Sequence, residues 1–164
     1  MSEEILRIAN CSGYYGDRLS AAREMVDGGP IDVLTGDYLA ELTMAILFNQ
    51  KLTRGEDKGY VGTFLKQLQD VASTCKDKNI KIVTNAGGLN PQSMTNEIRQ
   101  ILNELNIDMK VAYIEGDNLL SRIEELQKNG EEFTNIDKEI SLKDSGFPVL
   151  TANAYLGAWG IKEA

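Results

Sequence analysis

Short apolar runs alternate with amphipathic stretches along most of the chain. The runs have strand-like composition and predict strands at 5–10, 31–35, 80–85, 109–114 and 147–152. Between and after them, apolar residues at helical spacing predict helices at 18–26, 38–47, 60–75, 91–105, 118–128 and 154–164. Strands that alternate with helices form right-handed βαβ crossovers. The pattern therefore predicts an α/β fold with a mainly parallel sheet flanked by helices, in a three-layer, Rossmann-like arrangement.

The length of the chain bounds the number of domains. Its 164 residues fit one domain, which at this size buries roughly 70% of its unfolded surface. A partial (β/α) barrel shares the strand–helix pattern, although a complete one needs about 250 residues. The chain stops inside the amphipathic run 154–164, whereas domains usually end after a capped element. We therefore expect residues 1–164 to form a single α/β domain that is the amino-terminal portion of a longer, truncated one.

The junctions after the predicted strands share a composition. All five consist mainly of small or polar residues, and the first four include glycine or an acid, at 10–13, 35–37, 85–88, 115–117 and 151–153. Carboxyl ends of parallel strands meet at one edge of a sheet, where backbone N–H groups and helix N-termini converge on ligands. Strand-to-helix turns need glycines and capping residues whatever the function. Five such junctions together favour a shared ligand site.

Two glycine-containing junctions are the first candidates for binding. The segment 12–17, SGYYGD, could wrap a phosphate or an acyl-thioester group, but it lacks the third glycine of a dinucleotide fingerprint and the Gly-Lys-Thr of a P-loop. The pair Gly87-Gly88 would let the backbone approach a ligand, and a tight turn explains it equally well. The predicted ligand-binding residues are Ser12, Gly13, Tyr14, Gly16, Asp17, Asn85, Gly87, Gly88 and Asn153.

Carboxylates are the candidates for catalysis. The chain has no histidine, which excludes nucleophiles activated by histidine and histidine-ligated zinc within this chain. We therefore assign acid–base roles to Asp37, Glu41 and Asp117. Two carboxylates held close together would form an acid–base pair or hold Mg²⁺. Helix capping is the competing interpretation of Asp37 and Asp117.

Charge and cysteine content exclude several classes of partner. A net charge of −8 and no basic patch disfavour nucleic acids and anionic membrane surfaces. Cys11 and Cys75 lie far apart, without metal-ligand spacing or a disulfide framework, and suit a reducing cytosol. The sequence carries no signal-peptide pattern and no apolar run long enough for a membrane span. We expect a cytoplasmic protein, and the sequence assigns no metal-binding residues and no cofactor.

Five sequence blocks together carry a family resemblance. They are SGYYGD at 12–17, GGPID at 28–32, GDYLAELTM at 36–44, TNAGGLNP at 84–91 and TANAYLGAW at 151–159. In this order and spacing they resemble the AtuA-type acyclic terpene utilisation family over nearly the whole chain. The resemblance implies a role in the breakdown of citronellol, geraniol and related branched acyl-CoA compounds. It also implies a longer protein, because the last block normally leads into further sequence.

Two functional hypotheses follow. In the first, the chain is an enzyme or part of one, and performs a hydratase, lyase or isomerase reaction on an acyl-CoA or a terpenoid acid. The carboxylates above supply acid–base catalysis, and glycine backbones hold the anionic part. In the second, it is a non-catalytic binding or assembly subunit, a homo-oligomer or the partner of another chain. The apolar segment 155–159 would then form the interface.

Overall fold

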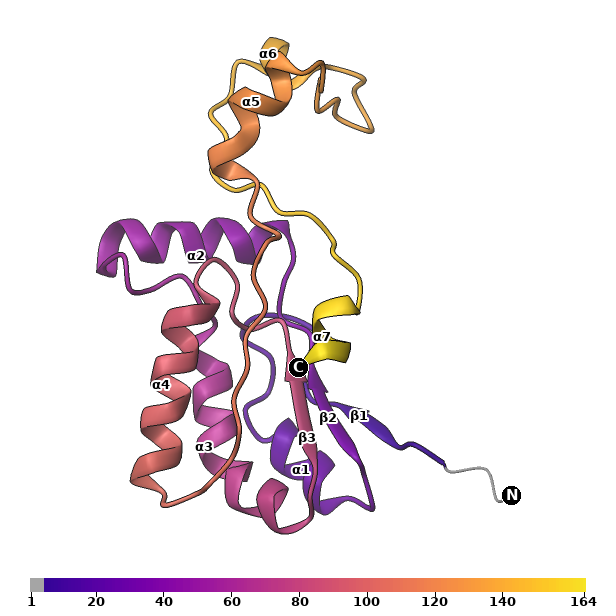
Figure 1. Cartoon of the computed structure of the whole chain (residues 1–164), viewed down its shortest axis with the longest axis vertical. Coiled ribbons are helices and arrows are strands. Elements are labelled where there is room, and N and C mark those ends of the chain that lie inside the picture. The colour runs from indigo at the N-terminus through magenta and orange to yellow at the C-terminus, as the bar shows by residue number, and fades with distance from the viewer. Residues whose placement is uncertain (1–4) are drawn as a thin grey trace. The chain divides into compact units, whose positions relative to one another are not determined.

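The computed structural model describes residues 5–164 (Figure 1). The chain divides into two compact units, unit 1 up to Tyr113 and unit 2 from Ile114 to Ala164. Each unit is described by itself below. The expectation of a single domain stays a prediction.

Unit 1 is built on a parallel sheet. Its strands are β1 (Ile8–Asn10), β2 (Val33–Gly36) and β3 (Lys81–Thr84), in the order β1-β2-β3. Its helices are α1 (Ala21–Asp27), α2 (Glu41–Arg54), α3 (Gly62–Asp77) and α4 (Pro91–Glu104). The predicted α/β class, with a parallel sheet flanked by helices, is confirmed.

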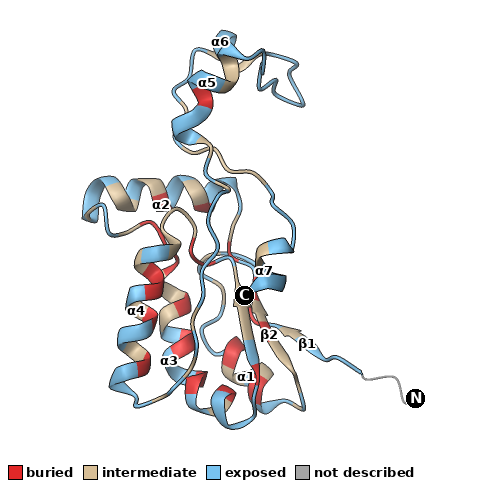
Figure 2. Cartoon of the chain, viewed as in Figure 1, coloured by how far each residue is buried: buried red, intermediate tan, exposed pale blue. Residues whose placement is uncertain are grey.

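The strand order explains where the helices pack. Both crossovers advance in the same direction across the sheet, and right-handed crossovers of this kind place their helices on the same face. Accordingly, α1 packs against α3, and Leu34 of β2 is buried with Val26 and Val71 of these helices. A second cluster joins α2, α3 and α4 through Leu47, Phe64 and Ile98. Figure 2 shows the buried residues along these helices in red.

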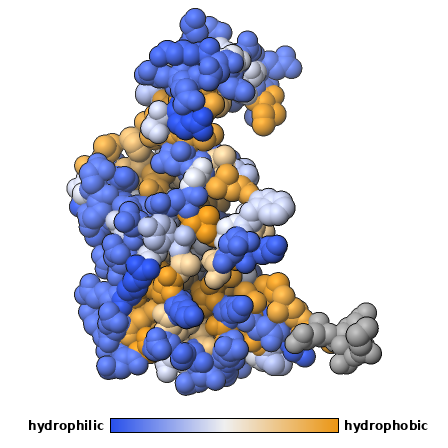
Figure 3. Space-filling model, viewed as in Figure 1, coloured by the Kyte–Doolittle hydropathy of each residue, from blue (hydrophilic) through white to orange (hydrophobic). Residues whose placement is uncertain are grey.

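Unit 2 has little regular structure. It contains a 3₁₀ turn η1 (Leu120–Arg122) and the short helices α5 (Ile123–Lys128), α6 (Leu142–Ser145) and α7 (Trp159–Glu163). A single antiparallel bridge joins Asn118 to Asn153. Ile123 is the one buried hydrophobic residue of 114–164. In Figure 3 the surface around α5 and α6 is mostly hydrophilic.

The strands predicted at 109–114 and 147–152 are wrong, because neither segment joins the sheet. In the first, Met109 and Val111 are partly buried against the core cluster of α3 and α4, and Lys110 between them is exposed. Packing against helices thus produces the same alternation as a half-buried strand. The second segment contains Pro148, which lacks the N–H that a ladder needs.

The helices near the carboxyl end are shorter than predicted. The run 154–164 forms only α7, and Gly157, whose φ is +69°, precedes it. The run 118–128 divides into η1 and α5. By contrast, α4 begins at Pro91 as predicted, with proline in its first turn. Within residues 5–164, every helix is too short or too polar to cross a bilayer.

Candidate functional site

The loops that follow the three strands of unit 1 are tied to one another by hydrogen bonds. The backbone N–H of Asp37 donates to the carbonyl of Ser12 at 3.0 Å, which joins the loops after β1 and β2. The backbone N–H of Tyr38 donates to Oδ1 of Asn85 at 2.9 Å, which joins the loops after β2 and β3. We call residues 12–17, 37–38 and 85–88 the strand-end rim. The predicted gathering of strand-end loops therefore holds for these three junctions.

The Asp37 carboxylate is the exposed, oriented acid of the rim. Nδ2 of Asn85 donates to its Oδ1 at 2.6 Å, and its Oδ2 makes no hydrogen bond within the part of the chain that is described. The competing interpretation as a helix cap is wrong, because α2 begins at Glu41 with Ala40 in the N-cap position and no side-chain cap. Asn85 thus orients the carboxylate through one oxygen and leaves the other oxygen without a partner among the described residues.

The Asp17 carboxylate accepts hydrogen bonds from within its own loop, the one that follows β1. The backbone N–H of Gly13 donates to Oδ2 at 3.0 Å, and the backbone N–H of Arg18 donates to Oδ1 at 2.7 Å. These two hydrogen bonds lower the pKa of Asp17. Backbone groups that we expected to bind a ligand anion therefore hold the chain's own carboxylate.

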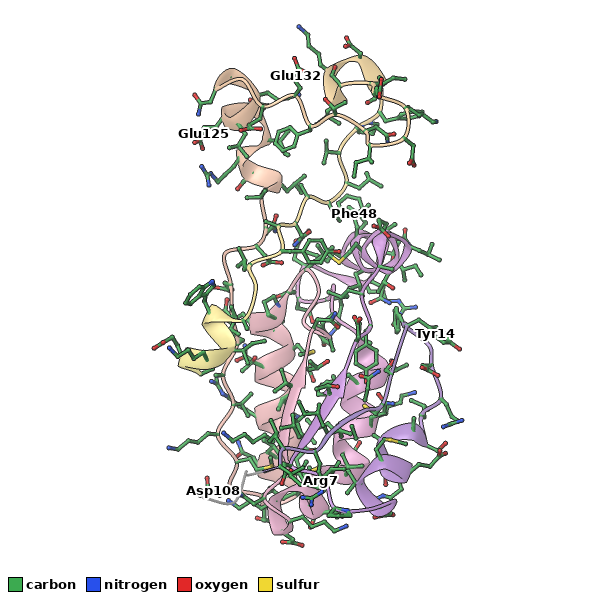
Figure 4. The ribbon with its side chains drawn as sticks, turned by 90° about the vertical axis from the view of Figure 1, so that its right-hand side faces the viewer. Arg7, Tyr14, Phe48, Asp108, Glu125 and Glu132 are labelled. Atoms are coloured by element: carbon green, nitrogen blue, oxygen red, sulfur yellow. The ribbon has the colours of Figure 1, made fainter. Side chains whose placement is uncertain are left out.

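Other residues of this loop face solvent. Tyr14 is 60% exposed, and Figure 4 shows it pointing outward from the loop. A Cβ added at Gly13 or at Gly16 would meet no atom within 4 Å. Gly16 has a φ of +99°, so this position of the turn favours glycine. The loop therefore leaves open space beside Gly13.

The pair Gly87-Gly88 forms a tight turn. A Cβ at Gly87 would lie 2.8 Å from Cβ of Pro91, and one at Gly88 would collide with Leu47. Gly88 also has a φ of +53°. Glycine at both positions is explained by close packing within unit 1, which favours the turn over direct ligand contact.

The sequence analysis missed a buried polar group beneath the rim. The Tyr38 phenol, 1% exposed, donates to Oε1 of Gln67, and it lies 3.9 Å from the Cys11 thiol. Burial raises the pKa of Tyr38 and of Cys11, so both keep their protons at neutral pH. The signal available in the sequence was Gln67, a polar residue among the apolar positions of α3.

A polar pair at the ends of β1 and β2 was also missed. Nδ2 of Asn10 donates to the carbonyl of Ser12 at 2.8 Å, and the Thr35 hydroxyl lies 3.1 Å from Oδ1 of Asn10. Asn10 is the last residue of β1 and Thr35 is the last but one of β2, whereas Asn85 directly follows β3. The strand-end rule that selected Asn85 would have selected them as well.

The remaining predicted residues belong to other segments of the chain. Glu41 is exposed in the first turn of α2. Asp117 and Asn153 belong to unit 2, where Nδ2 of Asn153 donates to Oδ2 of Asp117 at 2.9 Å. Asp117 caps no helix, since the side chain that accepts from the start of η1 is Asn118. Within 5–164, no cluster of three or more Cys, Asp or Glu side chains could hold a metal ion.

Comparison with known proteins identifies one family. The family model described as "Acyclic terpene utilisation family protein AtuA" matches residues 6–164. Comparisons with curated proteins and with solved structures give no significant match.

Proposed function

Because the chain belongs to the acyclic terpene utilisation family AtuA, we propose that its strand-end rim binds the oxygenated end of an acyclic terpenoid acyl-CoA or acid. Family membership gives the chain a role in acyclic terpene utilisation. The observation that carries the finer proposal is the Asp37 carboxylate, which is exposed, held on one oxygen by Asn85 and open on the other.

An oriented carboxylate suits acid–base catalysis. In the proposed reaction, Oδ2 of Asp37 takes a proton from a carbon beside the thioester carbonyl, or from an attacking water, and returns it to the substrate. Isomerisation and hydration share this proton movement. Asn85 holds the carboxylate in place, so less orientational freedom is lost when the substrate reaches it.

The carboxylates of the rim indicate whether a charged or a neutral group of the ligand binds there. Asp17 already occupies the N–H groups of Gly13 and Arg18, so a ligand anion would have to displace its carboxylate. The nearby carboxylate of Asp37 also repels a free acid. A thioester carbonyl, which is neutral, meets neither obstacle. For the group bound at the rim, we therefore favour the thioester end of an acyl-CoA over a free carboxylate.

Deuterium exchange into the substrate tests the proposal. The chain is incubated in D₂O with CoA thioesters of acyclic terpenoid acids, and deuterium incorporation is followed by mass spectrometry. Asp37→Asn keeps an oxygen that can accept from Asn85, and it should slow incorporation roughly 100-fold or more. Asp77→Asn, an exposed acid at the end of α3, is the matched control and should change nothing.

Thermal shift measurements with the same thioesters test binding separately. Saturating ligand at about 100 times its Kd should stabilise the wild-type chain by about 2.7 kcal/mol. Absence of both stabilisation and deuterium incorporation across the thioester series would overturn the proposal. Gly87→Val is unsuitable as a test because the added side chain would collide with Pro91 and disturb the fold.

A second candidate function rests on unit 2. Tyr155 is fully exposed and Trp159 is 78% exposed, and exposed aromatic residues of this kind are typical of interfaces. They favour a non-catalytic binding or assembly subunit, acting as a homo-oligomer or beside a partner chain. For either function we propose a cytoplasmic location, which two buried free thiols, Cys11 and Cys75, support.

A further inference from the structure

A polar side chain of α3 connects Tyr38 of the strand-end rim with Arg18, which directly follows the rim segment 12–17. Gln67 of α3 is 3% exposed, and its Oε1 accepts from the Tyr38 phenol. Its Nε2 donates to the carbonyl of Arg18 at 3.3 Å, at the end of the loop that Asp17 closes. The Gln67 side-chain amide thus contacts both Tyr38 and the end of the loop after β1.

Tyr38 is fixed from several sides. Its backbone N–H donates to Oδ1 of Asn85, and its carbonyl accepts from the Thr43 hydroxyl at 3.0 Å. Its ring meets the Phe64 ring edge-on, with centroids 6.1 Å apart. A Cβ at Gly36 would lie 2.6 Å from the Tyr38 ring, so glycine there makes room for it. The phenol therefore reaches Gln67 from a fixed position.

We infer that Tyr38 and Gln67 are positioning residues, which hold the 13–18 loop in register with the Asp37–Asn85 pair. The Asp37–Asn85 contact connects to Tyr38 through its backbone, and the loop connects to Tyr38 through Gln67. Changing the Tyr38 hydroxyl thus removes this side-chain link between the loop and the pair, and it leaves the Asp37–Asn85 contact and the backbone hydrogen bond from Asp37 to Ser12 in place. The consequence for ligand affinity rests on the function proposed above, whereas the consequence for the loop does not.

The energetic cost of burying the Gln67 amide favours a specific role for this residue over simple packing. Burying an amide is unfavourable unless its groups are hydrogen-bonded, and an apolar residue of similar shape would fill the same space at no such cost. Gln67 meets this demand with two partners, Tyr38 of the rim and Arg18, which directly follows the rim segment 12–17. Tyr38 keeps its proton because burial raises its pKa, so it remains the donor at neutral pH.

Hydrogen exchange measured by mass spectrometry on the full chain tests the inference without a ligand. In Tyr38→Phe, backbone amides of 13–18 should exchange roughly tenfold faster, because Gln67 loses its buried donor. Amides of α4 should keep their wild-type rates. The matched control is Tyr60→Phe, which removes a buried phenol of the same core cluster that contacts Glu97 rather than the rim.

Gln67→Leu is the second variant, and it places an apolar side chain of similar size on the buried face of α3. It should also speed exchange in 13–18, even where its midpoint of thermal unfolding matches that of the wild type. Wild-type exchange rates in 13–18 in both variants would overturn the inference. Should Tyr38→Phe fail to fold, Gln67→Leu alone decides in the same way.

Binding measurements with a ligand distinguish this inference from the proposed function. With a terpenoid CoA thioester as the probe, Tyr38→Phe should bind roughly tenfold more weakly than the wild type, and Tyr60→Phe should bind equally well. Unchanged affinity in Tyr38→Phe would overturn the positioning role. Faster exchange in the variants, together with no binding by the wild type, would instead sink the proposed function and leave the role of Tyr38 and Gln67 in ordering the loop intact.

Discussion

The two aspartates of the strand-end rim differ in what their oxygens contact. Asp17 gives both oxygens to backbone N–H groups, whereas Asp37 gives one oxygen to Asn85 and keeps the other open. A carboxylate with both oxygens engaged stabilises a loop, and one with a free oxygen can accept a proton from a substrate. The same residue type at two neighbouring strand ends thus serves structure in one case and, in our proposal, chemistry in the other.

The hydrogen bonds of Asp17 make the order of its loop pH-dependent. Its pKa is depressed in the folded chain, so the contribution to loop stability is present above the unfolded value and lost as pH falls through the folded pKa. We expect the amide chemical shift of Gly13, followed by NMR, to titrate with a midpoint below the ordinary aspartate value of 3.8. Asp17→Asn should abolish this titration. A midpoint at or above 3.8 in the wild type would contradict the assignment.

At the scale of elements, the glycine pair after β3 shows how a turn is built into the core. Gly88 has a positive φ, and its missing side chain leaves room for Leu47 of α2 and for the carbonyl of Gly59. The turn therefore sets how closely α2 approaches the start of α4. Asn90 then caps α4, accepting from the backbone N–H of Ser93 at 3.1 Å.

Substitution of Gly88 should destabilise the fold without any ligand. Gly88→Ala combines the cost of a left-handed backbone with displacement of Leu47, and we expect a loss of about 2–4 kcal/mol in the free energy of unfolding. Urea unfolding followed by circular dichroism measures it. Gly62→Ala is the matched control, because a Cβ there meets no atom within 4 Å, and it should stay within about 0.5 kcal/mol. Equal midpoints for the two variants would refute this account of the turn.

Sequence patterns predicted unit 1 well because its signals are local. Apolar runs, glycine stops and the proline at the start of α4 lie within a few residues of the elements they define. The contact between Asp37 and Asn85 depends on the β2–β3 register, which pairs Gly36 with Thr84 and is not local. Gln67 escaped prediction for the same reason, since its partners come from distant loops.

The errors in 109–114 and 147–152 have a related cause. Met109 and Val111 alternate with exposed residues as in a strand, yet they pack on helices. Period-two alternation reports burial on one side, not a hydrogen-bonded neighbour. A strand requires a hydrogen-bonded neighbour, and a local sequence pattern does not show whether one is present.

For the whole molecule, apolar burial is distributed unevenly between the two units. Both core clusters lie in unit 1, and Ile123 is the one buried hydrophobic residue of unit 2. Hydrophobic burial is the main favourable term in folding, so unit 1 should carry most of the cooperative stability. Unit 2 should open at a lower free-energy cost.

The single tryptophan tests this division, since Trp159 lies in unit 2 and is 78% exposed. Circular dichroism reports mainly the long helices of unit 1. We expect tryptophan fluorescence of the dilute chain to change little across the urea transition that circular dichroism records. Phe64→Trp in a Trp159→Phe background places the probe in the core of unit 1, and its fluorescence should follow that transition. A large, coincident change at Trp159 would show that the units unfold together.

Exposed aromatic residues on unit 2 matter for the second candidate function, because isolated apolar residues are normal on a surface but neighbouring ones mark interfaces. Tyr155 and Trp159 are close in sequence and both strongly exposed. Sedimentation velocity should therefore show association that increases with concentration, and Tyr155→Ser with Trp159→Ser should abolish it. Ile136→Ser removes an equally exposed side chain from a loop of the same unit and should leave association unchanged. A wild-type chain that stays monomeric at every concentration would exclude the homo-oligomer.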